Sequence, residues 1–267
     1  SSKPPIRIAL TPVFLDDQAV FVNEWRDYLQ QHLDRPVIFV QRGSYREITG
    51  LLNAGKLDFA WLCGYPYVRN KKSLRLVAVP LYHGKPLYQS YLIASSQDNQ
   101  TYSINDLDLK NFAFSDPDSN SGHLYTEYLL AKQGKKSSAF FNKTFFTWSH
   151  RKVVEAVAIG LAHGGAVDGY VWDTLSLLHP ELTSKTRIVS RSPEFGYPPF
   201  VAGIVAQKQD IETFRQVLFH MTRDEAGLRL LKKLNLDGFT HGDDGLFDSI
   251  EEMSRIVAKS NKKSTQK

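Results

Sequence analysis

The sequence predicts an α/β protein made of two lobes, and two observations support this fold class. First, short β-branched runs alternate with stretches of helical periodicity, which is typical of parallel sheets covered by helices. Second, two longer apolar runs, residues 87–94 and 200–206, stand where the chain would cross from one lobe to the other. We therefore expect a first lobe of residues 1–94 and 200–267 and a second lobe of residues 95–199, with a ligand cleft between them.

The first lobe is expected to begin with a βαβ unit. Residues 6–10 form a compact apolar strand, and residues 37–40 form a second, β-branched strand after the turn at Pro36. Between them, apolar side chains keep helical spacing: Phe21, Trp25, Tyr28, Leu29 and Leu33. Because the connections are short, the two strands should be parallel, with a right-handed crossover.

The alternation continues to the end of the first lobe. Tyr45, Ile48 and Leu52 mark a helix that Gly55 would end, and residues 57–62 and 76–81 are the next two strands. Further helices are expected at residues 211–221, 225–234 and 249–258, either packed back on this lobe or trailing from it.

The second lobe has the same composition of elements. Strands are expected at residues 111–114, 143–148 and 167–172, and a Val- and Ala-rich helix at residues 151–162. Leu124, Tyr128 and Ala131 indicate another helix, which Gly134 would end.

The stretch between the first of these strands and its helix is the strongest candidate for a binding site. Asp116-Pro117-Asp118 breaks the strand, and Ser119, Asn120, Ser121 and Gly122 follow at the helix start. Hydroxyls, an amide and backbone N–H groups at a helix N-terminus suit a phosphate-like anion. The alternative is an ordinary N-cap with no ligand.

Composition excludes several other classes. The net charge of +5 is spread over 267 residues and is dense only near Lys262 and Lys263, which we interpret as a solvated tail, so no nucleic-acid partner is expected. No apolar segment approaches the roughly 20 residues that span a bilayer. The chain opens at Ser1 with no signal-peptide pattern, as in a mature or trimmed chain whose signal or anchor is absent. The scattered histidines and the single cysteine predict no metal site and no cofactor.

Five stretches, in order, resemble one protein family. They are a tyrosine that opens a helix, then Gly-Lys-Leu-Asp-Phe-Ala at 55–60; Gly-Lys-Pro-Leu-Tyr at 84–88; the Asp-Pro-x-Ser-x-Ser-Gly loop at 116–122; a histidine before a Val/Ala-rich helix, followed by Val-Asp-Gly at 167–169; and the proline pair 198–199. Together they resemble the phosphate-, phosphite- and phosphonate-binding periplasmic solute-binding proteins, the PhnD-like substrate-capture components of ABC importers. The resemblance runs from about residue 6 to residue 234 and implies the type II two-lobed periplasmic binding protein fold.

The resemblance also implies a ligand site and partners. The ligand is expected to be a small tetrahedral oxyanion held by closure of the two lobes, and the partner an ABC transporter permease, with the chain itself a monomer in the periplasm or another extracytoplasmic space. The ligand-binding residues carried over by position are Tyr45, Tyr88, Ser119, Asn120, Ser121, Gly122, His150 and Asp168. Asp168 would accept a hydrogen bond from a protonated ligand oxygen or orient His150.

Two departures from the family bear on the ligand. The family usually has threonine where this chain has Asn120, and Tyr197 stands where relatives that bind aminoalkylphosphonates have an acid, so an aminoalkyl ligand is disfavoured although Glu194 lies nearby. Cys63 and Tyr65 follow a predicted strand and, with Tyr197, are candidates for the cleft wall.

The alternative function is the sensor domain of a membrane histidine kinase that recognises another oxyanion, such as a sulfur oxyanion. The chain has no Gly-x-Ser-x-Gly elbow, Walker loop or Gly-x-Gly-x-x-Gly fingerprint, so we predict a binding protein and not an enzyme.

Overall fold

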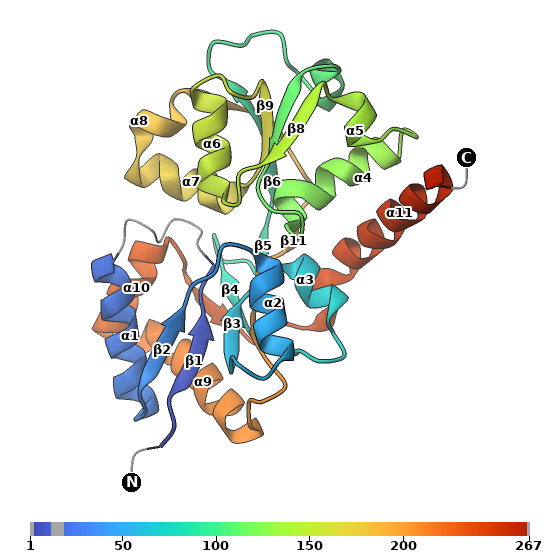
Figure 1. Cartoon of the computed structure of the whole chain (residues 1–267). Helices are drawn as coiled ribbons and strands as arrows, with labels where there is room; N and C mark the ends of the chain where they lie inside the picture. Colours follow the sequence, from blue (N-terminus) through green and yellow to red (C-terminus); the bar gives the residue numbers. More distant parts are fainter. Residues whose placement is uncertain (1–2, 12–18, 266–267) are drawn as a thin grey trace. The chain divides into compact units, whose positions relative to one another are not determined.

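A computed structural model describes residues 3–11 and 19–265, which form two compact units (Figure 1). Unit 1 comprises Ser1–Leu87 and Gly196–Phe247, and unit 2 comprises Tyr88–Phe195 and Asp248–Lys267. The chain passes from one unit to the other within two short paired strands, β5 (Leu87–Tyr88) and β11 (Phe195–Gly196). Among the described residues, no helix is both long and apolar enough to cross a membrane.

Unit 1 is built on one mixed sheet with the strand order β13-β4-β12-β3-β1-β2. Its strands are β1 (Ile6–Ala9), β2 (Val37–Val40), β3 (Phe59–Trp61), β4 (Arg75–Leu81), β12 (Phe200–Ala202) and β13 (Gly238–Thr240). β1 pairs in parallel with β2 and β3, as the βαβ pattern predicts, whereas β12 is antiparallel to both of its neighbours. The helices of this unit are α1 (Ala19–Leu33), α2 (Tyr45–Asn53), α3 (Gly64–Arg69), α9 (Lys208–His220) and α10 (Glu225–Leu234).

Aromatic side chains from α1 and the sheet form the centre of the unit 1 core. The predicted apolar stripe of α1 is the buried face of that helix, and Trp25 within it is fully buried. Its ring meets Trp61 and Phe200 edge to face, with centroids 6.3 Å and 6.1 Å away. Such tilted aromatic pairs stabilise a core beyond the apolar area that they bury.

Unit 2 has a sheet with the order β10-β6-β9-β7-β8. Its strands are β6 (Ser90–Ser95), β7 (Asn111–Phe114), β8 (Lys143–Phe146), β9 (Gly164–Asp168) and β10 (Thr186–Arg191). β7 is parallel to β8 and β9, so the carboxyl ends of these three strands lie at one edge of the sheet. The helices are α4 (Tyr125–Ala131), α5 (Ser137–Phe140), α6 (His150–Ala158), α7 (Gly169–Leu178), α8 (Pro180–Thr183) and α11 (Asp248–Thr265).

The structure differs from three sequence expectations about element boundaries. The apolar run 200–206 is not a crossing: β12 ends at Ala202 and lies between β3 and β4, where both of its faces are covered. The strand expected at 167–172 ends at Asp168, because the carboxylate of Asp168 caps the helix that begins at Gly169. The run 87–94 is divided between β5 and β6.

The C-terminal helix also departs from expectation. α11 belongs to unit 2 and packs against α4, although residues 200–267 were expected in the first lobe. Buried Ile250 and Met253 anchor its first half, and Lys262 and Lys263 lie in its last turn, so the basic stretch is helical.

Candidate functional site

The serine-rich loop after β7 is a buried helix start in unit 2. Ser119 has extended backbone angles and caps the following turn, because its Oγ accepts a hydrogen bond from the N–H of Gly122 at 2.9 Å. Ser119, Asn120, Ser121 and Gly122 are all buried. Since the oxygen of Ser119 is the acceptor in this contact, its hydroxyl hydrogen can be donated to a ligand.

The first turn after Ser119 is a π-helical turn, and this feature was not anticipated. The N–H of Leu124 donates to the carbonyl of Ser119 at 2.9 Å, five residues back, before α4 continues as an ordinary α-helix to Ala131. Single π-helical turns are rare and occur frequently at functional sites.

Ser115, at the end of β7, is a further polar residue at this loop that the sequence analysis missed. Its hydroxyl is buried and has no hydrogen-bond partner among the described residues. It lies against Gly122, where an added Cβ would come within 1.8 Å of Ser115 Oγ. Glycine at 122 is therefore required by close packing. The only sequence signal for Ser115 is its place just after a buried strand.

Among the predicted ligand-binding residues, the structure brings Tyr88 and Asn120 together as a first hydrogen-bonded pair. The side-chain amide of Asn120 donates to the Tyr88 hydroxyl at 3.0 Å, and both residues are buried. The phenol oxygen is thus an acceptor in this contact, and the bond joins β5 to the serine-rich loop. The loop is also tied to β6, since Ser90 Oγ donates to the carbonyl of Ser121 at 2.6 Å.

His150 and Asp168 form the second pair. His150 begins α6, where the side chain of Ser149 is the N-cap, and its Nδ1 accepts a hydrogen bond from the backbone N–H of Asp168 at 3.1 Å. Burial lowers the pKa of His150 from 6.5 to about 3, so the ring is neutral near pH 7. Since Nδ1 is an acceptor, the single proton of the neutral ring is on Nε2, which makes Nε2–H a hydrogen-bond donor.

The carboxyl group of Asp168 lies at the start of α7. Its Oδ1 accepts from the N–H groups of Tyr170 and Val171, at 2.8 Å and 3.2 Å. Burial raises the pKa of Asp168 to about 7, although these two backbone bonds act in the opposite direction. The orientation of His150 therefore depends on the backbone N–H of Asp168. The carboxyl group of Asp168 is not used in that contact and can exchange a proton near neutral pH.

These two pairs lie next to each other within unit 2. The π-helical turn packs against β9, the strand that ends at Asp168. Ser90, which holds the carbonyl of Ser121, is the register partner of Asp168 across the β6–β9 ladder. The loop, the phenol, the imidazole and the carboxyl group thus gather at the carboxyl end of the unit 2 sheet, where ligands of open α/β sheets usually bind.

The other candidates belong to unit 1. Tyr45 is the first residue of α2 and is 9% exposed. Cys63 is buried before α3, and Tyr65 lies within α3 with the guanidinium of Arg69 5.3 Å from its ring centroid. Tyr197 is fully buried, and its N–H donates to the carbonyl of Pro86 at 2.8 Å.

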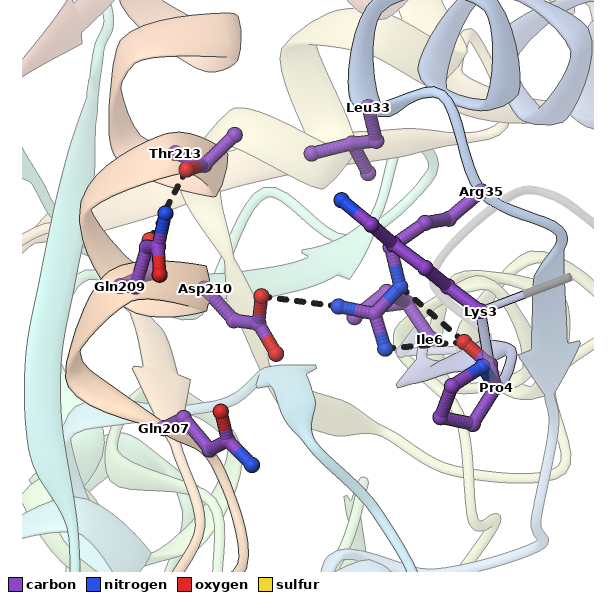
Figure 2. Close-up of a pocket in the computed structure, with 9 residues that line it drawn as sticks. All are labelled: Lys3, Pro4, Ile6, Leu33, Arg35, Gln207, Gln209, Asp210 and Thr213. Atoms are coloured by element: carbon purple, nitrogen blue, oxygen red, sulfur yellow. Dashed lines mark hydrogen bonds and ion pairs between the residues drawn. The ribbon is translucent and has the colours of Figure 1, made fainter. Parts of the chain in front are cut away.

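Unit 1 also has a polar hollow of about 280 Å³, shown in Figure 2. Arg35 lies in it, but its guanidinium is already paired with the carboxylate of Asp210 at 2.8 Å and donates twice to the carbonyl of Pro4. The guanidinium of Arg35 is therefore compensated by an anion of the chain, and Lys3 is a second cation that lines the hollow.

Comparison with known proteins identifies the family of this chain. The model of the family described as "ABC transporter, phosphonate, periplasmic substrate-binding protein" matches residues 8–247. The chain belongs to this family. As its members are substrate-binding components, family membership confirms the predicted periplasmic binding protein and the prediction that it is not an enzyme.

One curated relative carries a related description. The phosphate-import protein PhnD of Mycolicibacterium smegmatis is 28% identical over 158 residues, which are 55% of this chain and 48% of that protein. The chain thus spans about half the length of this relative.

Solved structures confirm the two-lobed periplasmic binding protein fold. A binding-protein component of an ABC phosphonate transporter from Pseudomonas aeruginosa has a TM-score of 0.89 at 20% identity, covering 97% of this chain and 88% of that one. PhnD1 of Prochlorococcus marinus, in complex with methylphosphonate, has a TM-score of 0.85 at 20% identity, with 96% and 98% covered. An alkanesulfonate-binding protein of Xanthomonas axonopodis pv. citri is more distant, with a TM-score of 0.62 at 15% identity over 98% and 94% of the two chains.

Proposed function

We propose that this protein captures a small phosphorus oxyanion, phosphate or a simple alkylphosphonate, and delivers it to the permease of an ABC transporter. The single observation that carries the proposal is the buried start of the π-helical turn, where Ser119 caps Gly122 and retains a hydroxyl hydrogen to donate. Neutral donors held in place before the ligand arrives bind an oxyanion without the cost of burying an unpaired positive charge.

The protonation states of the second pair support a phosphorus ligand. His150 supplies a neutral Nε2–H donor, because its pKa is about 3 and its Nδ1 is already used. With a pKa of about 7, Asp168 can accept a hydrogen bond from a ligand that still carries a P–OH proton. A fully ionised sulfate has no such proton to offer, so this carboxyl group favours monoprotonated phosphate and phosphonate over sulfate.

One residue of this chain bears on whether the ligand carries an amine. Tyr197, where an acid would face an ammonium group in relatives that bind aminoalkylphosphonates, favours a ligand without an amine. The Prochlorococcus relative that was solved with methylphosphonate is consistent with such a ligand. Tyr45 is part of this proposal through the family resemblance, and the cleft-wall candidates Cys63 and Tyr65 through their place after β3. We expect the protein to act as a monomer.

Isothermal titration of the purified protein tests this proposal. Phosphate, phosphite, methylphosphonate, 2-aminoethylphosphonate, sulfate and thiosulfate are each titrated at pH 7. We expect at least one phosphorus oxyanion without an amine to bind at least about a hundredfold more tightly than sulfate. If a sulfur oxyanion binds and no phosphorus ligand does, the phosphorus assignment fails and the sensor-domain alternative is favoured.

A further inference from the structure

Three side chains with metal-binding atoms meet in unit 1, where the ends of α1 and α9 lie near the start of α10. None of them belongs to the serine-rich loop of unit 2. They are His32 near the end of α1, His220 at the end of α9 and Asp224, the N-cap of α10. The Nε2 atoms of both histidines lie 3.4 Å from the same oxygen, Oδ2 of Asp224. All three ligand atoms lie within 4.8 Å of one another.

The ring of His32 is held so that Nε2 carries a lone pair when the ring is neutral. Its Nδ1 lies 2.9 Å from the backbone carbonyl of Tyr28, and a carbonyl can only accept, so the proton of the neutral ring is on Nδ1. Stacking on the Tyr28 ring, with centroids 4.0 Å apart, fixes the plane of the imidazole. Metal-binding histidines are usually held in this manner, with the second ring nitrogen donating to a carbonyl or carboxylate.

The carboxylate of Asp224 is held equally well. Its Oδ1 accepts from the N–H of Gly227 at 2.6 Å, and its Oδ2 accepts from the Tyr28 hydroxyl at 3.0 Å. Neutral His32 therefore directs a lone pair toward an oxygen that is negatively charged. Two acceptors that face each other are stable only with a cation between them, either a proton on the ring or a metal ion.

The distances favour a metal ion over a simple ion pair. A tetrahedral zinc site with ligands at about 2.0–2.1 Å places neighbouring ligand atoms roughly 3.3 Å apart. The two measured nitrogen–oxygen separations of 3.4 Å match that edge, whereas a charge-assisted N–H···O bond is typically about 2.7–2.9 Å. His220 is half exposed, so its ring can move the short distance that brings its nitrogen closer to that of His32.

We propose that His32, His220 and Asp224 bind a divalent transition-metal ion of the zinc class, with water at the remaining position. Imidazole and carboxylate ligands suit Zn²⁺, and hard cations such as Mg²⁺ prefer oxygen ligands alone. The bound ion links the end of α1 to the junction of α9 and α10. It therefore stabilises unit 1 by mass action, independently of the anion site.

The test measures zinc binding and thermal stability of the whole protein after chelator treatment. Wild type should bind one Zn²⁺ per chain, show a rise in melting temperature with ZnCl₂ and give the absorption spectrum of four-coordinate Co²⁺ when cobalt replaces zinc. His220→Gln should weaken Zn²⁺ affinity at least about tenfold and abolish the zinc-dependent rise in melting temperature, as loss of a ligand must cost at least as much as loss of an outer-shell partner. His220 is exposed enough for this change to leave the fold intact.

Two further variants complete the design. His241→Gln removes an exposed histidine of the same unit outside the cluster and should bind zinc like wild type. Asp224→Asn keeps a good N-cap for α10 but removes the charge, so it should fold and lose zinc affinity. The proposal is overturned if wild type shows no zinc-dependent stabilisation, or if His220→Gln binds zinc as tightly as His241→Gln.

Discussion

The backbone N–H of Asp168 donates a hydrogen bond to Nδ1 of His150 at 3.1 Å, and this contact joins two groups whose pKa values move in opposite directions. Burial lowers the pKa of His150 to about 3 and raises the pKa of Asp168 to about 7. Near pH 5 the native pair therefore holds its proton on Asp168, whereas the unfolded chain holds one on His150. As the number of bound protons is equal, this pair should contribute almost no pH dependence to stability between about pH 4 and 6.5.

Replacing His150 should make the contribution of Asp168 visible. In wild type the titration of His150 lowers the free energy of unfolding as pH falls below 6.5, because the unfolded chain binds a proton that the native ring does not. His150→Gln removes this pH-dependent contribution. Relative to wild type, the free energy of unfolding of the variant should rise as pH falls from about 6.5 to 4, with a slope approaching 1.4 kcal/mol per pH unit. Urea denaturation at several pH values measures it, and parallel curves for the two proteins would contradict it.

Replacing Asp168 should have the opposite effect. The titration of Asp168 lowers the free energy of unfolding as pH rises from about 4 to 7, because the native carboxyl group retains a proton that the unfolded chain has released. Asp168→Asn keeps the side-chain oxygen that caps α7 and removes the titration. Relative to wild type, its free energy of unfolding should therefore increase with pH over this interval. A difference that does not vary with pH would show that the native pKa of Asp168 is close to its ordinary value.

Gly122 should tolerate no side chain. In Gly122→Ala the new Cβ would meet Ser115 Oγ at 1.8 Å and Ser115 Cβ at 2.7 Å, so we expect a loss of roughly 1–3 kcal/mol in unfolding free energy, as for other overpacked sites. Gly50→Ala is the matched control, since it lies within α2 with open space around it and should be neutral or stabilising. Ser115→Gly combined with Gly122→Ala removes both contacts and should recover part of the loss. Failure of this second change to recover any stability would refute the packing explanation.

Position 120 should tolerate another neutral hydrogen-bond donor but not a negatively charged side chain. Asn120→Asp places a carboxylate in a fully buried position beside the Tyr88 hydroxyl, where it would repel an anionic ligand. We expect methylphosphonate affinity to fall at least about a hundredfold, because an unpaired buried charge costs several kcal/mol. Asn120→Thr replaces the amide donor with a neutral hydroxyl donor and should lose less than about tenfold in affinity. Titration calorimetry compares the two, and equal affinities would remove Asn120 from the site.

Much of the fold follows from the sequence because local patterns and burial agree. The stripe from Phe21 to Leu33 is the buried face of α1, and the break at Pro117 precedes the capped turn as predicted. The run after Val167 was misassigned, because a short apolar run fits a strand and a buried helix equally well. The decision between them is made by one side chain, since the Asp168 carboxylate caps α7.

The details of the site required tertiary structure. Sequence can place His150 before a helix, but the proton position on its ring depends on a backbone N–H eighteen residues away in the chain. His220 and Asp224 have the four-residue spacing of a helical pair, yet His32 joins them only through the packing of α1 against α9 and α10. The serine loop is different, because the cap by Ser119 is made within the loop itself, so the helix start was predicted although its π-helical form was not.

The central claim is that the Ser119–Gly122 turn binds the ligand, and the double variant Ser119→Ala/Ser121→Ala tests it most directly. The dissociation constant is measured by titration calorimetry with the phosphorus oxyanion that wild type binds best, and Ser137→Ala/Ser138→Ala, at the start of α5, is the control. Each hydrogen bond to a charged ligand contributes about 1.5–3 kcal/mol, so we predict at least about a hundredfold weaker binding in the first variant and no change in the control. A folded Ser119→Ala/Ser121→Ala protein with the wild-type dissociation constant would contradict the account.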